Sequence, residues 1–312
     1  MAIRQSVKLL AALHKSDKSF IFETDFRFIG KGQAHMFNRL KSVFSGSGSG
    51  YQGSSASSGK SRPIGRIIAV VVLLYLLVTI VLGMIWSSEP NTFSVREHTR
   101  TVSQEMGREP VTGFATTATM IRIGETLLDK PGGYISNDIF PPGLWMDNMP
   151  AWEYGVLVQL RDLSRALRQG MSRSQSQSAE DPDLTVAEPQ FHFNSDSWAL
   201  PSTEGEYRRG IRALESYLDR LSAPEGPEAH FYARADNLNN WLADLETRLG
   251  SLSRTLSESV GKPEVTEALA GVDDLDPLQE EERGADVKTP WTQIDNVFYE
   301  ARGTSWALLH IF

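Results

Sequence analysis

An uninterrupted apolar run constrains this chain more than any other feature. Residues 67–86 contain no charged side chain, and their polar atoms belong to Tyr75, Thr79 and Trp86. At about 1.5 Å of rise per residue, such a helix spans roughly 30 Å, the thickness of the hydrocarbon core of a bilayer. A core helix of a soluble domain is rarely apolar on every face for so long. The run therefore predicts a transmembrane helix, which we place at residues 64–86.

Charge is distributed unequally on the two sides of this helix. Residues 1–66 carry eleven Lys and Arg against three acidic residues, whereas the remainder carries 20 against 36. Because Lys and Arg collect on the cytoplasmic side of membrane helices, residues 1–63 are predicted to be cytoplasmic and residues 87–312 to lie outside. The acidity of this outer part argues against nucleic acid as its partner.

A cleaved signal peptide is the alternative explanation of the run. Signal peptides have a shorter apolar region, begin nearer the N-terminus and end in a small-x-small cleavage site. This run begins more than sixty residues into the chain and ends in an interfacial tryptophan, Trp86. We therefore predict an uncleaved signal anchor. The chain has no cysteine, which excludes disulfides, thiolate chemistry and Cys-ligated metal.

Two short segments precede the predicted span. Residues 45–63 have the Gly/Ser-rich composition of a flexible linker. Residues 1–44 are basic and amphipathic, and two interpretations remain open for them. They lie on the anionic inner leaflet of the membrane, or they form a disordered tail that only enforces the topology.

Helical signals dominate residues 87–312. The first is a capping box, Ser94 followed by Glu97, ahead of a segment that ends near Gly107. We predict an all-α domain of about five or six helices, arranged as an antiparallel bundle. The further helices are expected at residues 111–130, from near Pro150, after a capping box at Thr203 and Glu206, at residues 228–260 with a stripe of leucines, and from about residue 289 to the end.

The last predicted helix is expected to pack into the core. Its apolar face carries Ile294, Val297, Phe298, Ala301 and Leu308, of which Phe298 is the largest. The chain then ends on an apolar sequence without a capping signal, which predicts that the natural protein continues past Phe312.

Two stretches of sequence resemble a known family. They are YISNDIFPPGLWMDNMPAWE at residues 134–153 and TPWTQIDNVFYEARG at residues 289–303. Both are similar to signatures of a proteobacterial family of single-pass inner-membrane proteins catalogued as a domain of unknown function. The resemblance extends from the membrane span to the C-terminus. It implies an inner-membrane anchor with a periplasmic domain, and it implies no reaction.

The first of these stretches is also the best candidate for a binding loop. It combines polar and acidic side chains with two tryptophans, as many sugar-binding clefts do. The alternative is architectural, with Asn and Asp as turn and cap residues and Trp as core, and we favour it because capping chemistry explains most positions. The candidate residues are Asn137, Asp138, Trp145, Asp147, Asn148, Trp152 and Glu153.

No motif indicates a catalytic residue, a metal site or a cofactor. The six histidines show neither an i, i+4 pair nor the spacing of a zinc protease. The sequence therefore favours a non-catalytic, membrane-tethered helical domain that binds or scaffolds a component of the cell envelope. Its predicted partners are the lipid bilayer and an envelope protein or a second copy of the chain. The alternative is an envelope hydrolase acting on glycan with carboxylates of residues 137–153.

Overall fold

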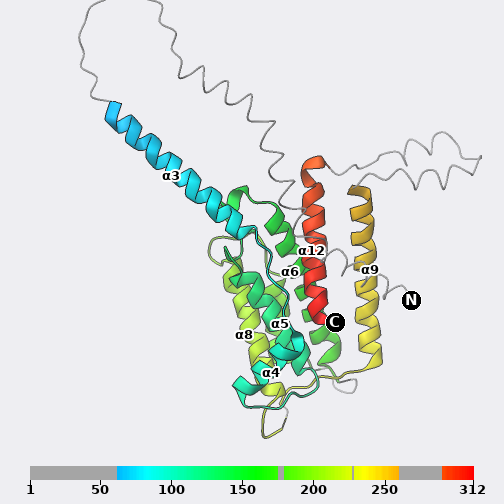
Figure 1. Ribbon diagram of the computed structural model, residues 1–312. Helices are drawn as coiled ribbons and strands as arrows, with labels where there is room; N and C mark the ends of the chain where they lie inside the picture. Colours follow the sequence, from blue (N-terminus) through cyan, green and yellow to red (C-terminus); the bar gives the residue numbers. More distant parts are fainter. Residues whose placement is uncertain (1–61, 175–178, 227, 260–289) are drawn as a thin grey trace, which may run out of the picture. The chain divides into compact units, whose positions relative to one another are not determined.

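The computed structural model describes residues 62–174, 179–226, 228–259 and 290–312 (Figure 1). These residues form eight α-helices and contain no strand, so the predicted all-helical fold class is confirmed for them. The chain divides into two compact units, residues 1–78 and 79–312. The predictions for residues 1–44 and for nearly all of the 45–63 linker fall outside the described residues.

Helix α3 (Arg62–Trp86) contains the apolar run. By length and composition, its segment Gly65–Trp86 is the one helix among the described residues that could cross a membrane. From Ile67 to Ile85 the large apolar side chains are between 36% and 67% exposed, whereas Trp86 is partly buried against the core of the second unit. The core helix of a soluble protein buries such side chains, whereas those of α3 are exposed.

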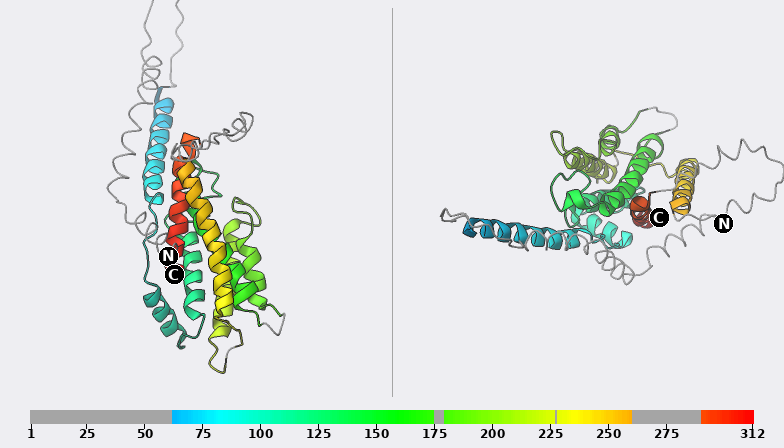
Figure 2. Two further views of the ribbon diagram at one scale, coloured as in Figure 1. Left: turned by 90° about the vertical axis from the view of Figure 1, so that its right-hand side faces the viewer. Right: turned by 90° about the horizontal axis from the view of Figure 1, so that it is seen from above.

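The second unit contains the remaining helices (Figure 2). Within it α6 packs most extensively against α12, and α8 packs against both α7 and α5. The bounds of these helices are α4 (Val95–Met106), α5 (Phe114–Asp129), α6 (Asn148–Ala166), α7 (Pro182–Phe191), α8 (Thr203–Leu221), α9 (Ala235–Ser259) and α12 (Ile294–Ile311).

Local sequence signals account for several helix ends. The Ser94 side chain accepts a hydrogen bond from the backbone N–H of Glu97 at the start of α4, and Gly107 ends that helix in a left-handed conformation. At α8 the prediction is one residue late, because Ser202 rather than Thr203 provides the N-terminal cap. The long helix α9 begins at Ala235 instead of near residue 228.

Helix α7 is absent from the sequence prediction. It has a clear start signal, since Asp181 accepts hydrogen bonds from the backbone of Asp183 and Leu184, and Pro182 occupies the first turn. A second proline, Pro189, lies within its ten residues and disguises the helical pattern. The apolar side of so short a helix gives little periodic signal.

A π-helical turn, Leu167–Met171, continues α6. The backbone N–H of Ser172 donates to the carbonyl of Leu167 at 2.9 Å, five residues back. The turn directs carbonyl groups toward the chain that leads into α9. There the Gly170 carbonyl accepts from Asn237 at 2.9 Å and the Met171 carbonyl accepts from the Tyr232 N–H at 2.6 Å.

The buried apolar core lies between α5, α6, α7, α8 and α12. Trp152 of α6 and Trp306 of α12 are fully buried, with ring centroids 5.3 Å apart. Ala301 and Leu308 are buried as predicted, but Phe298 is only half-buried, and its ring lies beneath the Arg302 guanidinium. The largest anchor of α12 is therefore Trp306 rather than Phe298.

Two glycines allow α6 and α12 to approach at backbone distance. A side-chain carbon on Gly303 would lie 2.1 Å from the carbonyl oxygen of Trp152, and one on Gly155 would lie 2.2 Å from that of Glu300. Neither carbonyl belongs to a flexible side chain, so a larger residue at either glycine has to push the helices apart.

We predict that Gly303→Ala lowers the free energy of unfolding by about 3 kcal/mol, because the added methyl overpacks a contact between two backbones. The matched control is Gly250→Ala in α9, where an added carbon meets nothing within 4 Å. That substitution should instead raise stability by up to about 1 kcal/mol through helix propensity. Urea unfolding of the purified protein in detergent measures both, and equal stability of Gly303→Ala and the parent would contradict the close crossing.

Candidate functional site

The predicted binding loop is folded onto α6 by one side chain, Glu153. This carboxylate is completely buried and accepts hydrogen bonds from the backbone N–H groups of Ile135 and Ser136, both at 2.8 Å. It also accepts from the Ser136 hydroxyl and from the ammonium group of Lys130. Four donors from residues 130–136 thus converge on a single carboxylate.

The electrostatics of this pair are those of a compensated buried ion pair. Burial lowers the pKa of Lys130, and the neighbouring Glu153 carboxylate opposes that shift. Neither side chain reaches solvent. Because every lone pair of Glu153 faces a donor of the protein itself, its geometry is that of a structural group and leaves no position for a substrate.

Asn137 and Asp138 continue the loop with different environments. The Asn137 amide donates to the Ser197 carbonyl at 3.0 Å and to the Glu204 carboxylate at 2.9 Å, which ties the loop to the start of α8. Asp138 is partly buried, and burial raises its pKa, with further contributions from the negative charges of Glu153 and Glu204.

The other candidate residues of this loop do not gather at one pocket. Trp152 belongs to the core, whereas Trp145 is largely exposed. Asp147 holds the N-cap position of α6, but its side chain is exposed and makes no cap hydrogen bond, contrary to the capping role expected of it. The buried Asn148 side-chain oxygen has no hydrogen-bond partner.

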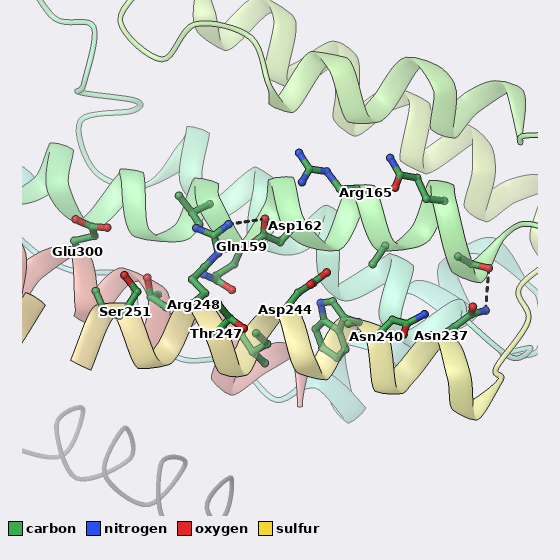
Figure 3. A pocket seen from close by; sticks show the side chains of 18 of the residues that line it. Gln159, Asp162, Arg165, Asn237, Asn240, Asp244, Thr247, Arg248, Ser251 and Glu300 are labelled. Carbon is green, nitrogen blue, oxygen red and sulfur yellow. Dashed lines mark hydrogen bonds and ion pairs between the residues drawn. The ribbon is translucent and has the colours of Figure 1, made fainter. Parts of the chain in front are cut away.

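A groove of about 820 Å³ lies elsewhere, between α6, α9 and α12 (Figure 3). Arg248 of α9 reaches across it to Asp162 of α6, with nitrogen–oxygen distances of 2.5 and 3.0 Å. Its walls are otherwise mainly amide, hydroxyl and charged side chains. They include Gln159, Arg165, Asn237, Asn240, Asp244, Thr247, Ser251 and Glu300.

Two polar groups among the residues that line this groove are buried without full compensation. The side-chain nitrogen of Gln159 is buried and has no hydrogen-bond partner. Burial raises the pKa of Glu300, while the positive charge of Arg248 partly opposes the shift. Unsatisfied or desolvated polar groups in a concave surface are typical of binding sites.

The sequence prediction missed this groove. Its walls come from three helices that are far apart in the sequence, and α9 contacts α6 only sparsely. Of the leucine stripe of α9, only Leu245 is buried. Stacking of Trp241 on Phe312, with ring centroids 5.2 Å apart, helps to hold α9 against α12. The loose packing of α9 leaves the space.

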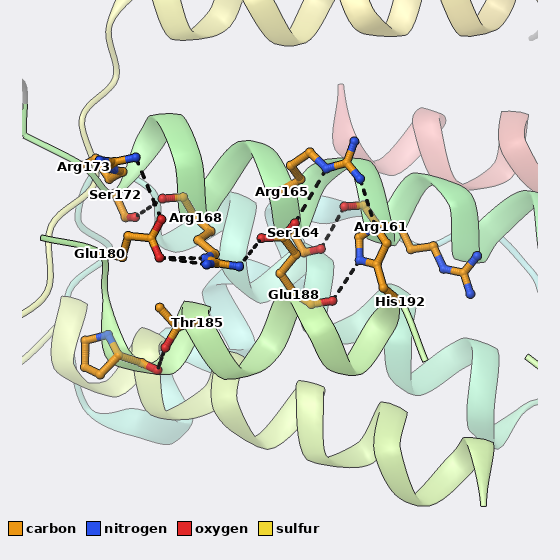
Figure 4. A network of polar contacts seen from close by, with 11 residues as sticks. Arg161, Ser164, Arg165, Arg168, Ser172, Arg173, Glu180, Thr185, Glu188 and His192 are labelled. Carbon is orange, nitrogen blue, oxygen red and sulfur yellow. Dashed lines mark hydrogen bonds and ion pairs between the residues drawn. The ribbon is translucent and has the colours of Figure 1, made fainter. Parts of the chain in front are cut away.

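A second polar cluster, between α6 and α7, is structural (Figure 4). Arg168 of the π turn donates to Glu180 at 2.8 and 3.0 Å and to Glu188 at 2.9 Å. These hydrogen bonds raise the pKa of the guanidinium, with Glu180 as the largest contribution. Each carboxylate is matched by an arginine, so the cluster fixes α7 beside α6 and presents no free reactive group. Within the described part of the chain, no group of three or more His, Asp or Glu side chains is placed to hold a metal ion.

Comparison with known proteins gives one match. A family model described as "Uncharacterized protein conserved in bacteria (DUF2333)" covers residues 60–312. No curated protein and no solved structure matches the chain. The match includes both sequence stretches that carry the family resemblance and extends over the predicted span.

We predict that Glu153→Gln lowers the free energy of unfolding by about 3–5 kcal/mol, because it leaves the Lys130 charge buried without compensation. Exposed Glu246 provides the control, and Glu246→Gln should change stability by no more than about 0.5 kcal/mol. Combining Lys130→Met with Glu153→Gln should restore part of the loss, as a double-mutant cycle in urea would show. Additive losses would mean that the two charges do not interact.

Proposed function

The chain belongs to a family of uncharacterised proteins conserved in bacteria, and we propose that it is a non-catalytic binding or scaffolding component of the cell envelope. In this proposal α3 anchors the protein in the inner membrane. Residues 87–312 form a periplasmic antiparallel helical bundle, and the groove between α6, α9 and α12 holds a polar segment of a partner protein or of a second copy.

The membrane anchor is supported by the surface of α3 and by charge. The helix exposes its large apolar side chains from Ile67 to Ile85. The excess of Lys and Arg before it and of acids after it follows the positive-inside rule. The C-terminal end of α3 is also integrated in the folded second unit. There a side-chain carbon on Gly132 would lie 2.7 Å from the Trp86 indole, which favours an uncleaved anchor over a removed signal sequence.

The groove is the observation that carries the binding proposal. Its volume is within the range of ligand sites, and its walls carry charges of both signs together with several amides. Such a lining suits a polar, charged stretch of polypeptide better than an apolar ligand.

The glycan hydrolase is a less supported alternative. Glycoside hydrolysis uses two carboxyl groups that flank the scissile bond. In the candidate loop Glu153 is saturated by protein donors, and Asp147 lies on the surface. In the groove Asp162 is neutralised by Arg248. Asp138 and Glu300 have raised pKa values chiefly because both are partly buried. The two carboxylates that act on Asp138, Glu153 and Glu204, both accept hydrogen bonds from donors of the protein.

Reporter fusions test the topology. A fusion before Pro63 should report the cytoplasm and one after Ser88 the periplasm, because the charge asymmetry orients the span. The parent is compared with a variant in which Lys60, Arg62 and Arg66 are changed to Glu. Because this variant reverses the charge before the span, its preference for this orientation should be weaker. A periplasmic signal at residue 40 of the parent would contradict the proposal.

Photo-crosslinking tests the groove. A photoreactive amino acid at Ser251, which lines the groove, should give a discrete adduct in intact cells, and the same residue at Ser253 should give none. The two positions lie on nearly opposite faces of α9, since successive residues turn by about 100°. Arg248→Glu, which removes the pairing with Asp162, should abolish the adduct.

The mass of the adduct separates the possible partners. An adduct of twice the mass of the chain identifies a second copy, and any other mass identifies a different envelope protein. Identical adduct patterns from Ser251 and Ser253, or no adduct from any position in the groove, would contradict the binding proposal. Release of glycan fragments by the purified protein would favour the hydrolase.

A further inference from the structure

We propose that two loops of the second unit insert apolar side chains into the lipid surface that surrounds the end of α3. The first loop is residues 139–145 and the second is residues 197–201. This inference rests on the proposed membrane anchor and adds to it a second, independent contact with the bilayer. We call the exposed side chains of these loops the apolar rim, which comprises Ile139, Phe140, Leu144, Trp145, Trp198 and Leu200.

The apolar rim is unusual in its exposure and in its lack of charge. Phe140 is 72% exposed, Trp145 and Trp198 are both 61% exposed, and Leu200 is completely exposed. No charged residue occurs within residues 139–146 or within residues 197–203. Large apolar side chains grouped in this way on a folded surface mark a site of contact with a membrane or a protein.

The two loops are held side by side by hydrogen bonds. The Asn137 amide donates to the Ser197 carbonyl at 3.0 Å, and the Tyr134 hydroxyl donates to the Ser195 carbonyl at 3.0 Å. Within the first loop, Gly143–Trp145 forms a 3₁₀ turn, so that adjacent residues Leu144 and Trp145 both reach solvent. The rim is therefore a preformed surface, and its side chains are exposed without any movement of the loops.

The position of the rim beside α3 identifies its occupant. A side-chain carbon on Gly83 would lie 3.6 Å from Cβ of Pro142, so the last turns of the span touch the first loop directly. Both residues belong to the second unit. Gly83 lies three residues before Trp86, the last residue of α3, whose indole packs against the second unit. Side chains beside this point meet the boundary between lipid headgroups and acyl chains when α3 crosses a bilayer.

The composition of the rim agrees with a lipid surface. Tryptophan and phenylalanine are favoured at the membrane interface, where amphipathic surfaces bury their apolar side chains by several ångströms. The loops carry no charged side chain that would have to enter that layer, and the exposed acids that flank them, Asp147 and Asp196, would remain among the headgroups. A partner protein on this face would have to approach a surface that already touches the span.

The chain contains no cysteine, so single cysteines can be introduced without background. We would label Leu144→Cys and Leu200→Cys of the full-length protein with an environment-sensitive fluorophore. The control is Glu225→Cys, an exposed position just beyond the far end of α8, which is about 28 Å long for its 19 residues. Each protein is reconstituted into phosphatidylcholine vesicles, with and without lipid that carries a spin label near the headgroup.

We expect the fluorophores at residues 144 and 200 to shift to the blue and to be quenched by the spin-labelled lipid, and the fluorophore at residue 225 to do neither. Flotation with the vesicles measures the anchor separately. Failure to float would overturn the anchor, whereas flotation without quenching at residues 144 and 200 would overturn only the lipid contact of the rim. A blue shift without quenching, together with a dimer by cross-linking, would assign the rim to a second copy and also overturn this inference.

Discussion

The buried carboxylate of Glu153 is the contact on which the arrangement around the end of α3 depends. It gathers the ammonium group of Lys130, two backbone N–H groups and one hydroxyl from a single stretch of chain. That stretch has no regular structure of its own, so its backbone donors would otherwise have to face water. Because Glu153 fixes this stretch to α6, the residues that follow it contact the start of α8 and the last turns of α3.

The second constraint is the close approach of α6 and α12. Glycines at facing positions let two backbones touch, and the two large indoles beside them fill the space where the helices are further apart. This combination of smallest and largest residues gives a contact that other side chains cannot reproduce. Residues far apart in the sequence thereby become neighbours, and the wall of the polar groove is built from both helices.

The sequence predicts the helices of this protein better than it predicts the sites between them. The start of α4 at Ser94 and its end at Gly107 are marked by local signals, and the span is recognised from its length and apolar composition. The short helix with Pro189 gives only a weak periodic signal and is missed. The groove depends on how closely α9 approaches α6, and the role of Glu153 depends on donors that lie 17 to 23 residues away in the chain. Neither the spacing between α9 and α6 nor the set of donors to Glu153 produces a pattern within one segment of the sequence.

The π turn at the end of α6 changes the direction in which the side chains and carbonyl groups of the following residues point. A π turn accommodates one more residue than an α-helical turn, so the side chains beyond it are rotated relative to those before it. In this protein Arg168 thereby meets Glu180 and Glu188, while the carbonyls of Gly170 and Met171 meet the approach to α9. The contacts on both sides of this turn therefore depend on one extra residue, and removing that residue would rotate the groups that make them.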